Sequence, residues 1–446
     1  MRKWLSSLSY ISINFIAILL LLPLLFGLLA EKKCAQLAEI INTTTPFNAK
    51  IINYQRGWFS ATATAQVSLE KLEISSSKLQ PLVISAHIIH GPMFIDWTRF
   101  QFAQAIVNVD INFNAEQNRL SKRAVDAKPI ASAKIKLRLS GDTIITLNSL
   151  PFAHQDQEND IYWEGIKTRS IFSPLGNQVK SDLDFSGIEI KRKDFDLHIG
   201  KITSSYQGSK TTVGLWVGKR DLFLDSFSTK NDNNHTIAFD GLDIHNIVTE
   251  NQKNSTNITT DISINNININ GGIYNHNKLN FEIDKLDQTL LTKIQQRLLS
   301  SKIISTPASL GLDILISILN NGSEIKIKEI STNTPWGKFL SSITITSANQ
   351  NNNPGLLATI ANSTINADIK AERVLALHLL EKFYQIIPSQ TKSNNPEKQA
   401  EDLLNEWQQS GKIVTSDQDN YLHLIFDYKN NQPLINNKLL ILTTQP

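Results

Sequence analysis

Two closely spaced histidines are the first residues whose types and spacing suggest chemistry. His87 and His90 are three positions apart, which on a helix would place both imidazoles on one face as metal ligands. The neighbouring Ile88 and Ile89 favour a strand, in which an odd separation directs the two side chains to opposite faces. Zinc also needs a third and usually a fourth ligand, and the single cysteine, Cys34, follows the N-terminal apolar run. We therefore expect no metal site.

Other catalytic patterns are weak or absent. The segment 208–211, Gly-Ser-Lys-Thr, ends like a phosphate-binding loop, but it lacks the required preceding glycine and a following helix, so we interpret it as a turn. Acidic pairs at a spacing of two share a strand face, which suits either a cation or a solvated surface. These pairs are Asp182 with Asp184, Asp194 with Asp196, and Asp417 with Asp419. With no G-x-S-x-G, G-x-G-x-x-G or H-E-x-x-H motif, the sequence predicts no catalytic, cofactor-binding or metal-binding residue, and a protein that is not an enzyme.

The elements that must position these residues are mainly strands. Apolar and polar residues alternate with period two in many segments, which predicts strands with one buried face. Clear examples are 61–67, 135–139, 195–199, 325–328 and 343–346. In the Ile-Asn stretch, Ile262 and Ile264 are out of phase with Ile267 and Ile269, so a bulge or tight turn is expected at 265–266.

Three segments have helical spacing instead. Apolar residues recur at three- and four-residue intervals near 287–304, 372–387 and 396–411, and the last range has Asn395 as N-cap and Pro396 at the first helical position. A C-terminal hairpin is predicted over 420–442. The expected fold class is therefore α+β and mostly β: long antiparallel curved sheets covered by a few helices.

The N-terminus contains an apolar run that matches a membrane span. Residues 10–30 have no charge and are long enough for a helix to cross a bilayer, and no small-residue cleavage site follows. We expect a cytoplasmic N-terminus at 1–9, a transmembrane anchor at 10–30, and one exported β-rich domain at 31–446. Without the five charges that flank the run, 40 of the 44 basic and 40 of the 41 acidic residues remain, so no basic field for nucleic acid is present.

Two short motifs contain the best candidate site residues. In the first, we expect Gly57 to occupy a bulge or a close backbone approach inside an aromatic strand, with Tyr54, Trp58 and Phe59 packed around it and Arg56 at the strand edge. The second motif should end a strand in a turn, because proline fixes φ; it consists of His90, Gly91 and Pro92. Roles in the fold are favoured for both motifs, and a contact to a ligand or partner is the alternative.

These motifs also carry a resemblance to a known family. The run NYQRGWFSATATAQVSL at 53–69, the His-Gly-Pro at 90–92 and the C-terminal segment 372–440 resemble the YdgA family, a group of bacterial proteins of unknown function. The resemblance implies a protein of the Gram-negative inner membrane, with a single N-terminal anchor and a β-rich periplasmic body. It implies no chemistry.

Two functional hypotheses follow. The first is a non-enzymatic, membrane-anchored scaffold or partner-binding protein in cell-envelope organisation, through self-association or an envelope protein partner, because strand edges and tryptophans are plentiful. The alternative is periplasmic binding or transfer of lipid, or another hydrophobic ligand, along a curved β-sheet whose strands are rich in isoleucine. Beyond the lipid bilayer at 10–30, no cofactor and no nucleic acid is expected.

Overall fold

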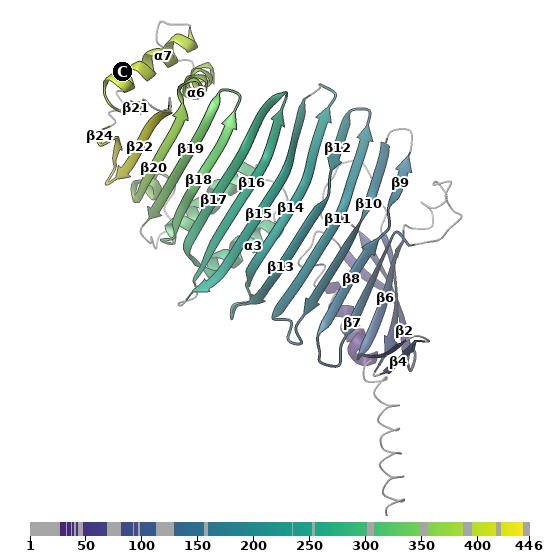
Figure 1. Cartoon of the computed structure of the whole chain (residues 1–446). Coiled ribbons are helices and arrows are strands. Elements are labelled where there is room, and N and C mark those ends of the chain that lie inside the picture. The colour runs from purple at the N-terminus through teal and green to yellow at the C-terminus, as the bar shows by residue number, and fades with distance from the viewer. Residues whose placement is uncertain are drawn as a thin grey trace, which may run out of the picture. The chain divides into compact units, whose positions relative to one another are not determined.

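The computed structural model shows a chain built mainly from long antiparallel strands (Figure 1). It describes residues 27–32, 34–36, 38–39, 42, 48–68, 82–91, 93–96, 99–112, 129–155, 159–233, 235–251, 255–300, 307–347, 356–386, 395–415 and 421–439. Among these residues, 22 strands belong to one sheet, and two more pair with each other separately. The prediction of a mostly β chain with an antiparallel sheet is thus confirmed.

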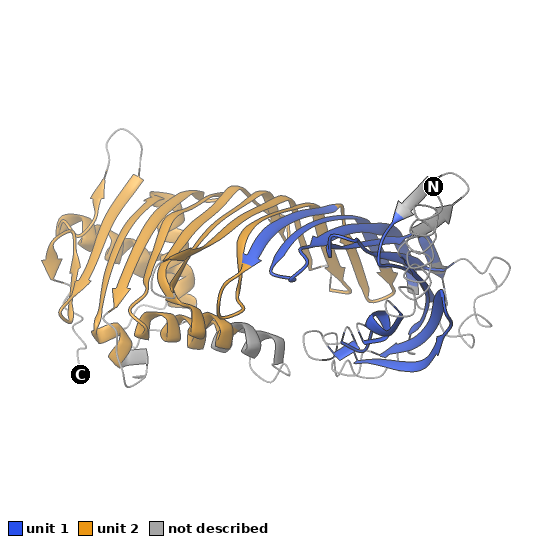
Figure 2. Ribbon diagram, turned by 90° about the horizontal axis from the view of Figure 1, so that it is seen from below, with its two compact units in different colours: residues 1–190, 202–209, 296–302 blue, residues 191–201, 210–295, 303–446 orange. Residues whose placement is uncertain are grey.

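The contacts divide the chain into two compact units, coloured separately in Figure 2, where the sequence suggested one continuous domain at 31–446. Unit 1 contains residues 1–190, 202–209 and 296–302, and unit 2 contains 191–201, 210–295 and 303–446. No linker separates them in the sequence.

Unit 1 is built from short strands that pair in sequence order. Its strands are β1 (Asn48–Arg56), β2 (Ser60–Ser68), β3 (Leu82–His90), β4 (Met93–Asp96), β5 (Arg99–Phe102), β6 (Ala105–Asn112), β7 (Ala131–Leu137), β8 (Thr143–Ser149), β9 (Phe152–Gln155), β10 (Asn159–Phe172), most of β11 (Gln178–Arg192) and most of β13 (Ile202–Lys210). The order β1, β2, β3, β6, β7, β8, β10 is antiparallel throughout, and β4 pairs only with β5 among the described strands.

A helical segment at 27–32 completes the core of unit 1. Ala30 packs with Ala61, Ala63, Ile88 and Val107. The small alanine side chains let the helical backbone come close to the sheet, because interiors are close-packed and a larger side chain would separate the two.

Unit 2 contains the longest strands. They are β12 (Phe195–Ile199), β14 (Trp216–Asn231), β15 (Thr236–Asn251), β16 (Ser255–Ile269), β17 (Gly272–Asp287), β18 (Glu324–Thr334), β19 (Gly337–Ser347), β20 (Ser363–Glu372), β21 (Val414–Thr415), β22 (Tyr421–Lys429), β23 (Gln432–Ile435) and β24 (Lys438–Leu439). From β14 to β20, each strand pairs antiparallel with the next in sequence, and β20 then pairs with β22.

Five described helices accompany the strands: α3 (Gln288–Ser300), α4 (Pro307–Asn320), α5 (Leu356–Ala361), α6 (Arg373–Ile386) and α7 (Pro396–Gln409). Helices thus occur in all three ranges where apolar spacing predicted them. The side chain of Asn395 accepts a hydrogen bond from the Lys398 N–H at 3.2 Å, so it caps α7. In Figure 1, α3 lies behind strands β15 and β16.

Two local predictions are corrected. The return strand of the hairpin at 420–442 is divided into β23 and β24, because Asn436 and Asn437 adopt positive φ angles of 46° and 63° and form a second turn. At Asn265, β16 continues without a one-sided bulge. The irregularity is shared with Gly241 on β15, which has a φ of 64° and stands unpaired opposite Asn265 in the strand register.

The transmembrane helix is not found in the described part of the chain. No helix there is both long and apolar enough to cross a bilayer, and most of the predicted span, residues 10–26, lies outside the described residues.

Candidate functional site

The face of the unit 2 sheet that carries α3 and α4 is apolar over many strands. Aliphatic residues that pair directly in the strand register form a row across six adjacent strands, which we call the covered row. The covered row consists of Val248, Ile258, Ile283, Ile325, Ile345 and Ile365. Helices α3 and α4 pack on its four central members, because Leu290 and Leu291 of α3 and Ile318 of α4 share a cluster with Ile258, Ile283, Ile325 and Ile345.

A second apolar row runs beside the first on the same face. On β15, β16 and β17, each member lies an even number of residues from the covered-row residue of the same strand, so both point to the same face. On β18, a register shift between Ile327 and Ile330 brings Ile330 to that face as well. We call this second row the open row: Leu222, Ile244, Ile262, Leu279 and Ile330. Every member is half-buried, and none belongs to the cluster around α3 and α4. Part of each aliphatic side chain therefore stays accessible.

The opposite face of the same strands is mainly polar, although Phe223 and Ile247 on it are 40% and 41% exposed. Residues paired in register form a polar row across five strands: Asp221, His245, Asp261, Asn280 and Glu329. His245 Nδ1 lies 2.8 Å from Asp221 Oδ1, and its Nε2 lies 3.3 Å from Asp243 Oδ2. The hydrogen bond to Asp221 raises the pKa of His245, and the same bond lowers the pKa of Asp221.

A shallow cavity of about 250 Å³ lies on this polar face, lined in part by His245, Asp261 and Asn280. The Asn280 side-chain amide donates a hydrogen bond to Asp261 Oδ1, so this carboxylate oxygen already has a partner within the sheet. No group of three His, Cys, Asp or Glu side chains suited to a metal ion occurs in the described ranges. The polar row can therefore hold its histidine charged, but it presents no nucleophile beside a general base.

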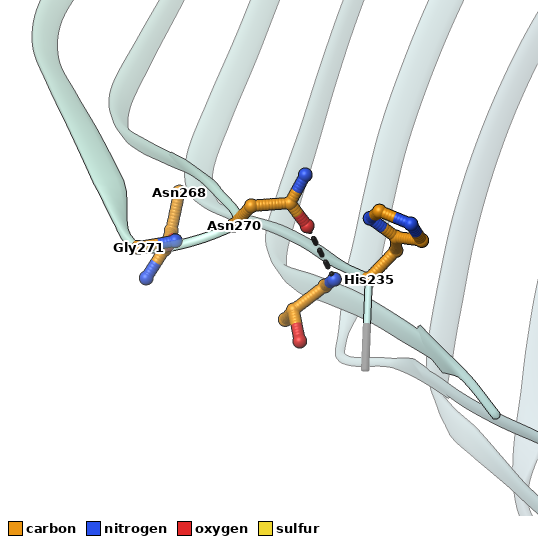
Figure 3. Close-up of a pocket in the computed structure, with 5 residues that line it drawn as sticks. His235, Asn268, Asn270 and Gly271 are labelled. Atoms are coloured by element: carbon orange, nitrogen blue, oxygen red, sulfur yellow. Dashed lines mark hydrogen bonds between the residues drawn. The ribbon is translucent and has the colours of Figure 1, made fainter. Parts of the chain in front are cut away.

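A further cavity opens beside the β14–β15 and β16–β17 turns, and Figure 3 shows the residues that line it. The Asn270 side chain accepts from the Thr236 N–H at 2.9 Å, and the Gly271 N–H donates to Asn268 Oδ1 at 2.9 Å. Asn270 and Gly271 have φ angles of 51° and 89°, as the central residues of a tight hairpin turn require. Both hydrogen bonds close the turns themselves. His235 is the one titratable residue in the lining, so the cavity contains no pair of groups for acid–base chemistry.

The first sequence motif lies in a turn between β1 and β2 and not inside a strand, but the close backbone approach predicted at Gly57 is present: an added Cβ would stand 2.9 Å from the Ser60 carbonyl oxygen. The N–H of Gly57 donates to the Ser60 carbonyl at 2.7 Å and closes the hairpin between β1 and β2. Trp58 and Phe59 are 49% and 53% exposed, so they do not pack around the glycine as predicted. Two hydrophobic side chains at a hairpin tip are costly in water unless another surface covers them.

Tyr54 and Arg56 of this motif face the N-terminal helical segment. Tyr54 packs against the core that contains Ala30, and its hydroxyl is buried without a hydrogen-bond partner in the described part of the chain. Burial, together with nearby Cys34 and Glu31, raises the pKa of Tyr54 to about 12. Arg56 does not lie unpaired at a strand edge: its Nη1 is 3.5 Å from Glu31 Oε2, in an exposed ion pair.

The second motif ends β3 and packs on the same helical segment. His90 is 3% exposed, and both of its ring nitrogens are buried. A methyl group on Gly27 would stand 2.7 Å from His90 Cε1, so ring and helix are in direct contact. Burial lowers the pKa of His90, which is therefore held neutral.

Gly91 allows a close approach of two backbones. Its N–H donates to the Gln104 carbonyl at 2.7 Å, and an added Cβ would overlap the Ala103 carbonyl oxygen. Pro92 lies outside the described residues. The motif thus joins the helical segment, the end of β3 and the residues just before β6.

Cys34 also lies in this region, packed against the same core. Burial and the nearby Glu31 raise the pKa of its thiol, which disfavours the reactive thiolate. No described group is therefore activated for covalent chemistry here.

Sequence reasoning missed the open row and the polar row. Their members come from five strands separated by up to 108 positions, from Asp221 to Glu329, and only the pairing register brings them together. The one local signal was strand alternation, which assigns residues to faces but not to rows.

Comparison with known proteins gives one informative match. A family model described as "Bacterial protein of unknown function (DUF945)" matches residues 1–442. No curated protein and no solved structure matches the chain.

Proposed function

Because this chain belongs to the bacterial DUF945 family, whose function is unknown, we propose a function from its own geometry: it is a membrane-anchored envelope protein that binds lipid acyl chains on the apolar face of unit 2. The observation that carries this proposal is the open row, a strip of five half-buried aliphatic residues outside the cluster of α3 and α4.

The energetics favour an apolar ligand over water on this strip. Each methylene group that leaves water contributes about 0.8 kcal/mol, so a few carbons of an acyl chain along the row would contribute several kcal/mol. The adjacent covered row already binds apolar side chains of α3 and α4, so the same face accepts apolar groups. The charged and amide side chains of the polar row favour contact of the opposite face with water.

The anchor and the location belong to the same proposal. The uncharged run at 10–30 is the membrane span, the body is periplasmic, and the family affiliation is with the YdgA group of Gram-negative bacteria. An anchor places the apolar face close to a supply of lipid, which is consistent with binding or transfer.

The scaffold hypothesis has less support from the described aromatic residues. Trp58 is the exposed tryptophan among them. Trp163 packs against Phe152 and Phe185, and Trp336 stacks on His378 at 3.8 Å between ring centroids. Aromatic groups engaged within the fold are not available to a protein partner.

A crosslinking experiment tests the proposal. A photoreactive amino acid replaces Ile262 of the open row in the full-length protein, and Ser263, the next residue on the opposite face, serves as the matched control. Irradiation in native membranes should attach phospholipid at position 262 and not at 263, as read by mass spectrometry. Equal labelling at both positions, or protein adducts at 262 without lipid, would overturn the proposal and favour a scaffold.

Substitution gives an independent measurement. Ile262→Asn should reduce the phospholipid that co-purifies with the full chain in mild detergent, because an amide on the open row must lose its hydration when an acyl chain covers it. Ser263→Asn introduces the same residue on the polar face and should leave the lipid content unchanged. A lipid-free wild-type protein would contradict acyl-chain binding.

A further inference from the structure

Large exposed hydrophobic residues gather at one end of the strands of unit 1. Five of them occupy turns or strand termini: Trp58, Phe59, Phe102, Leu139 and Leu175, with exposed fractions of 49, 53, 59, 49 and 86%. We call this set the apolar rim. Such a concentration of exposed apolar side chains marks a surface that contacts another apolar phase or molecule.

The strand register places the rim residues at a common end. Ser60, just after Trp58 and Phe59, pairs with Ile89, and His90 pairs with Ala105, which follows Phe102. On the following strands, Ala105 pairs with Leu137, Leu137 with Thr143, and Thr143 with Phe172. The turns after Leu137 and Phe172 contain Leu139 and Leu175, and a Cβ on Gly141 in one turn would touch Pro174 in the other.

The N-terminal helical segment reaches the same end. Gly27 contacts the His90 ring, and the His90 N–H donates to the Phe59 carbonyl at 2.8 Å. Gly91 bonds to Gln104, two residues after Phe102. Gly27 lies within the last four residues of the uncharged run 10–30, so the described end of that run and the rim lie at the same end of the strands.

We infer that the apolar rim lies in the interfacial region of the bilayer that holds the anchor, as a second and non-helical membrane contact of unit 1. Aromatic side chains favour the headgroup level of membranes. This contact would fix the orientation of unit 1 on the membrane. The inference rests on the membrane anchor of the proposed function, and the experiment below separates the two.

Spin-label depth measurements on the full-length protein test the inference. In a Cys34→Ser background, single cysteines replace Phe59, Leu175, Leu150 or Leu20, and each protein is reconstituted in vesicles of phosphatidylethanolamine and phosphatidylglycerol. Leu150 is the matched control: it is 49% exposed and follows Ser149, at the opposite end of β8 from the rim. Leu20 reports on the anchor.

Labels at positions 59 and 175 should lose accessibility to a water-soluble nickel complex and gain accessibility to oxygen, as the label at 20 does, while the label at 150 stays in water. If the labels at 59 and 175 are as accessible to nickel as the label at 150 while the label at 20 is inserted in the membrane, the membrane contact of the apolar rim is refuted and the anchor is retained. A label at 20 that stays in water would overturn both. Because 59 and 175 lie in different turns, disruption of one turn does not remove the test.

Discussion

Substitution of Gly91 by alanine is expected to destabilise unit 1 more than any exposed glycine substitution. The new methyl group would overlap the Ala103 carbonyl oxygen and stand 2.9 Å from both the Ala103 carbonyl carbon and the Gln104 oxygen. All three atoms belong to backbone, so no flexible side chain can move aside. The segments carrying residues 91 and 103 must separate instead.

Separation breaks the hydrogen bond from the Gly91 N–H to the Gln104 carbonyl, now 2.7 Å. The lost bond and a buried donor without a partner cost about 1–3 kcal/mol, and the backbone shift adds about 1–3 kcal/mol as in other overpacked cores. We expect a loss of about 2–6 kcal/mol, a large share of the stability of an ordinary domain.

Urea denaturation of the full chain in mild detergent, followed by tryptophan fluorescence and circular dichroism, measures this effect. Gly311→Ala is the matched control, because nothing lies within 4 Å of a Cβ there and the residue is inside helix α4. The control should be neutral or up to about 1 kcal/mol more stable, since alanine is the better helix former. Equal midpoints for the two variants would refute the close approach at Gly91.

Three further predictions concern Gly27 and two histidines. Gly27→Ala should destabilise the protein because its methyl group presses on the His90 ring, and His90→Ala in the same chain should restore part of the loss, which a double-mutant cycle of denaturation midpoints measures. Additive effects would contradict the contact. Because the pKa of His90 is lowered from 6.5 by burial, its stabilising contribution is complete above pH 6.5 and is lost as the pH falls; His90→Asn should therefore flatten the decline in midpoint between neutral and acidic pH, and an unchanged slope would count against a buried neutral ring. The pKa of His245 is raised from 6.5 by Asp221, so the contribution of His245 to stability is complete below pH 6.5 and is lost as the pH rises. In His245→Gln, this decrease of the denaturation midpoint with rising pH should disappear. A decrease equal to that of the wild type would exclude the ion pair between His245 and Asp221 as its cause.

Local sequence patterns were sufficient where an element depends on near neighbours. The N-cap Asn395 followed by Pro396 specifies the start of α7, and apolar residues at helical spacing indicated α3 and α6. Period-two alternation predicted strands and their faces, because the side chains of consecutive strand residues must point to opposite sides.

Tertiary structure alone decided how those faces are assembled. The open row and the polar row exist because hairpin registers align residues from β14 to β18, and a shift of one residue would exchange the two faces. The contact of Gly27 with the His90 ring likewise depends on two segments that are distant in the sequence. By itself the sequence determined a mostly β chain with an uncharged N-terminal run, since composition and periodicity are local properties. The choice of which apolar side chains are covered and which stay accessible belongs to the fold, because burial depends on every neighbour that packing brings near.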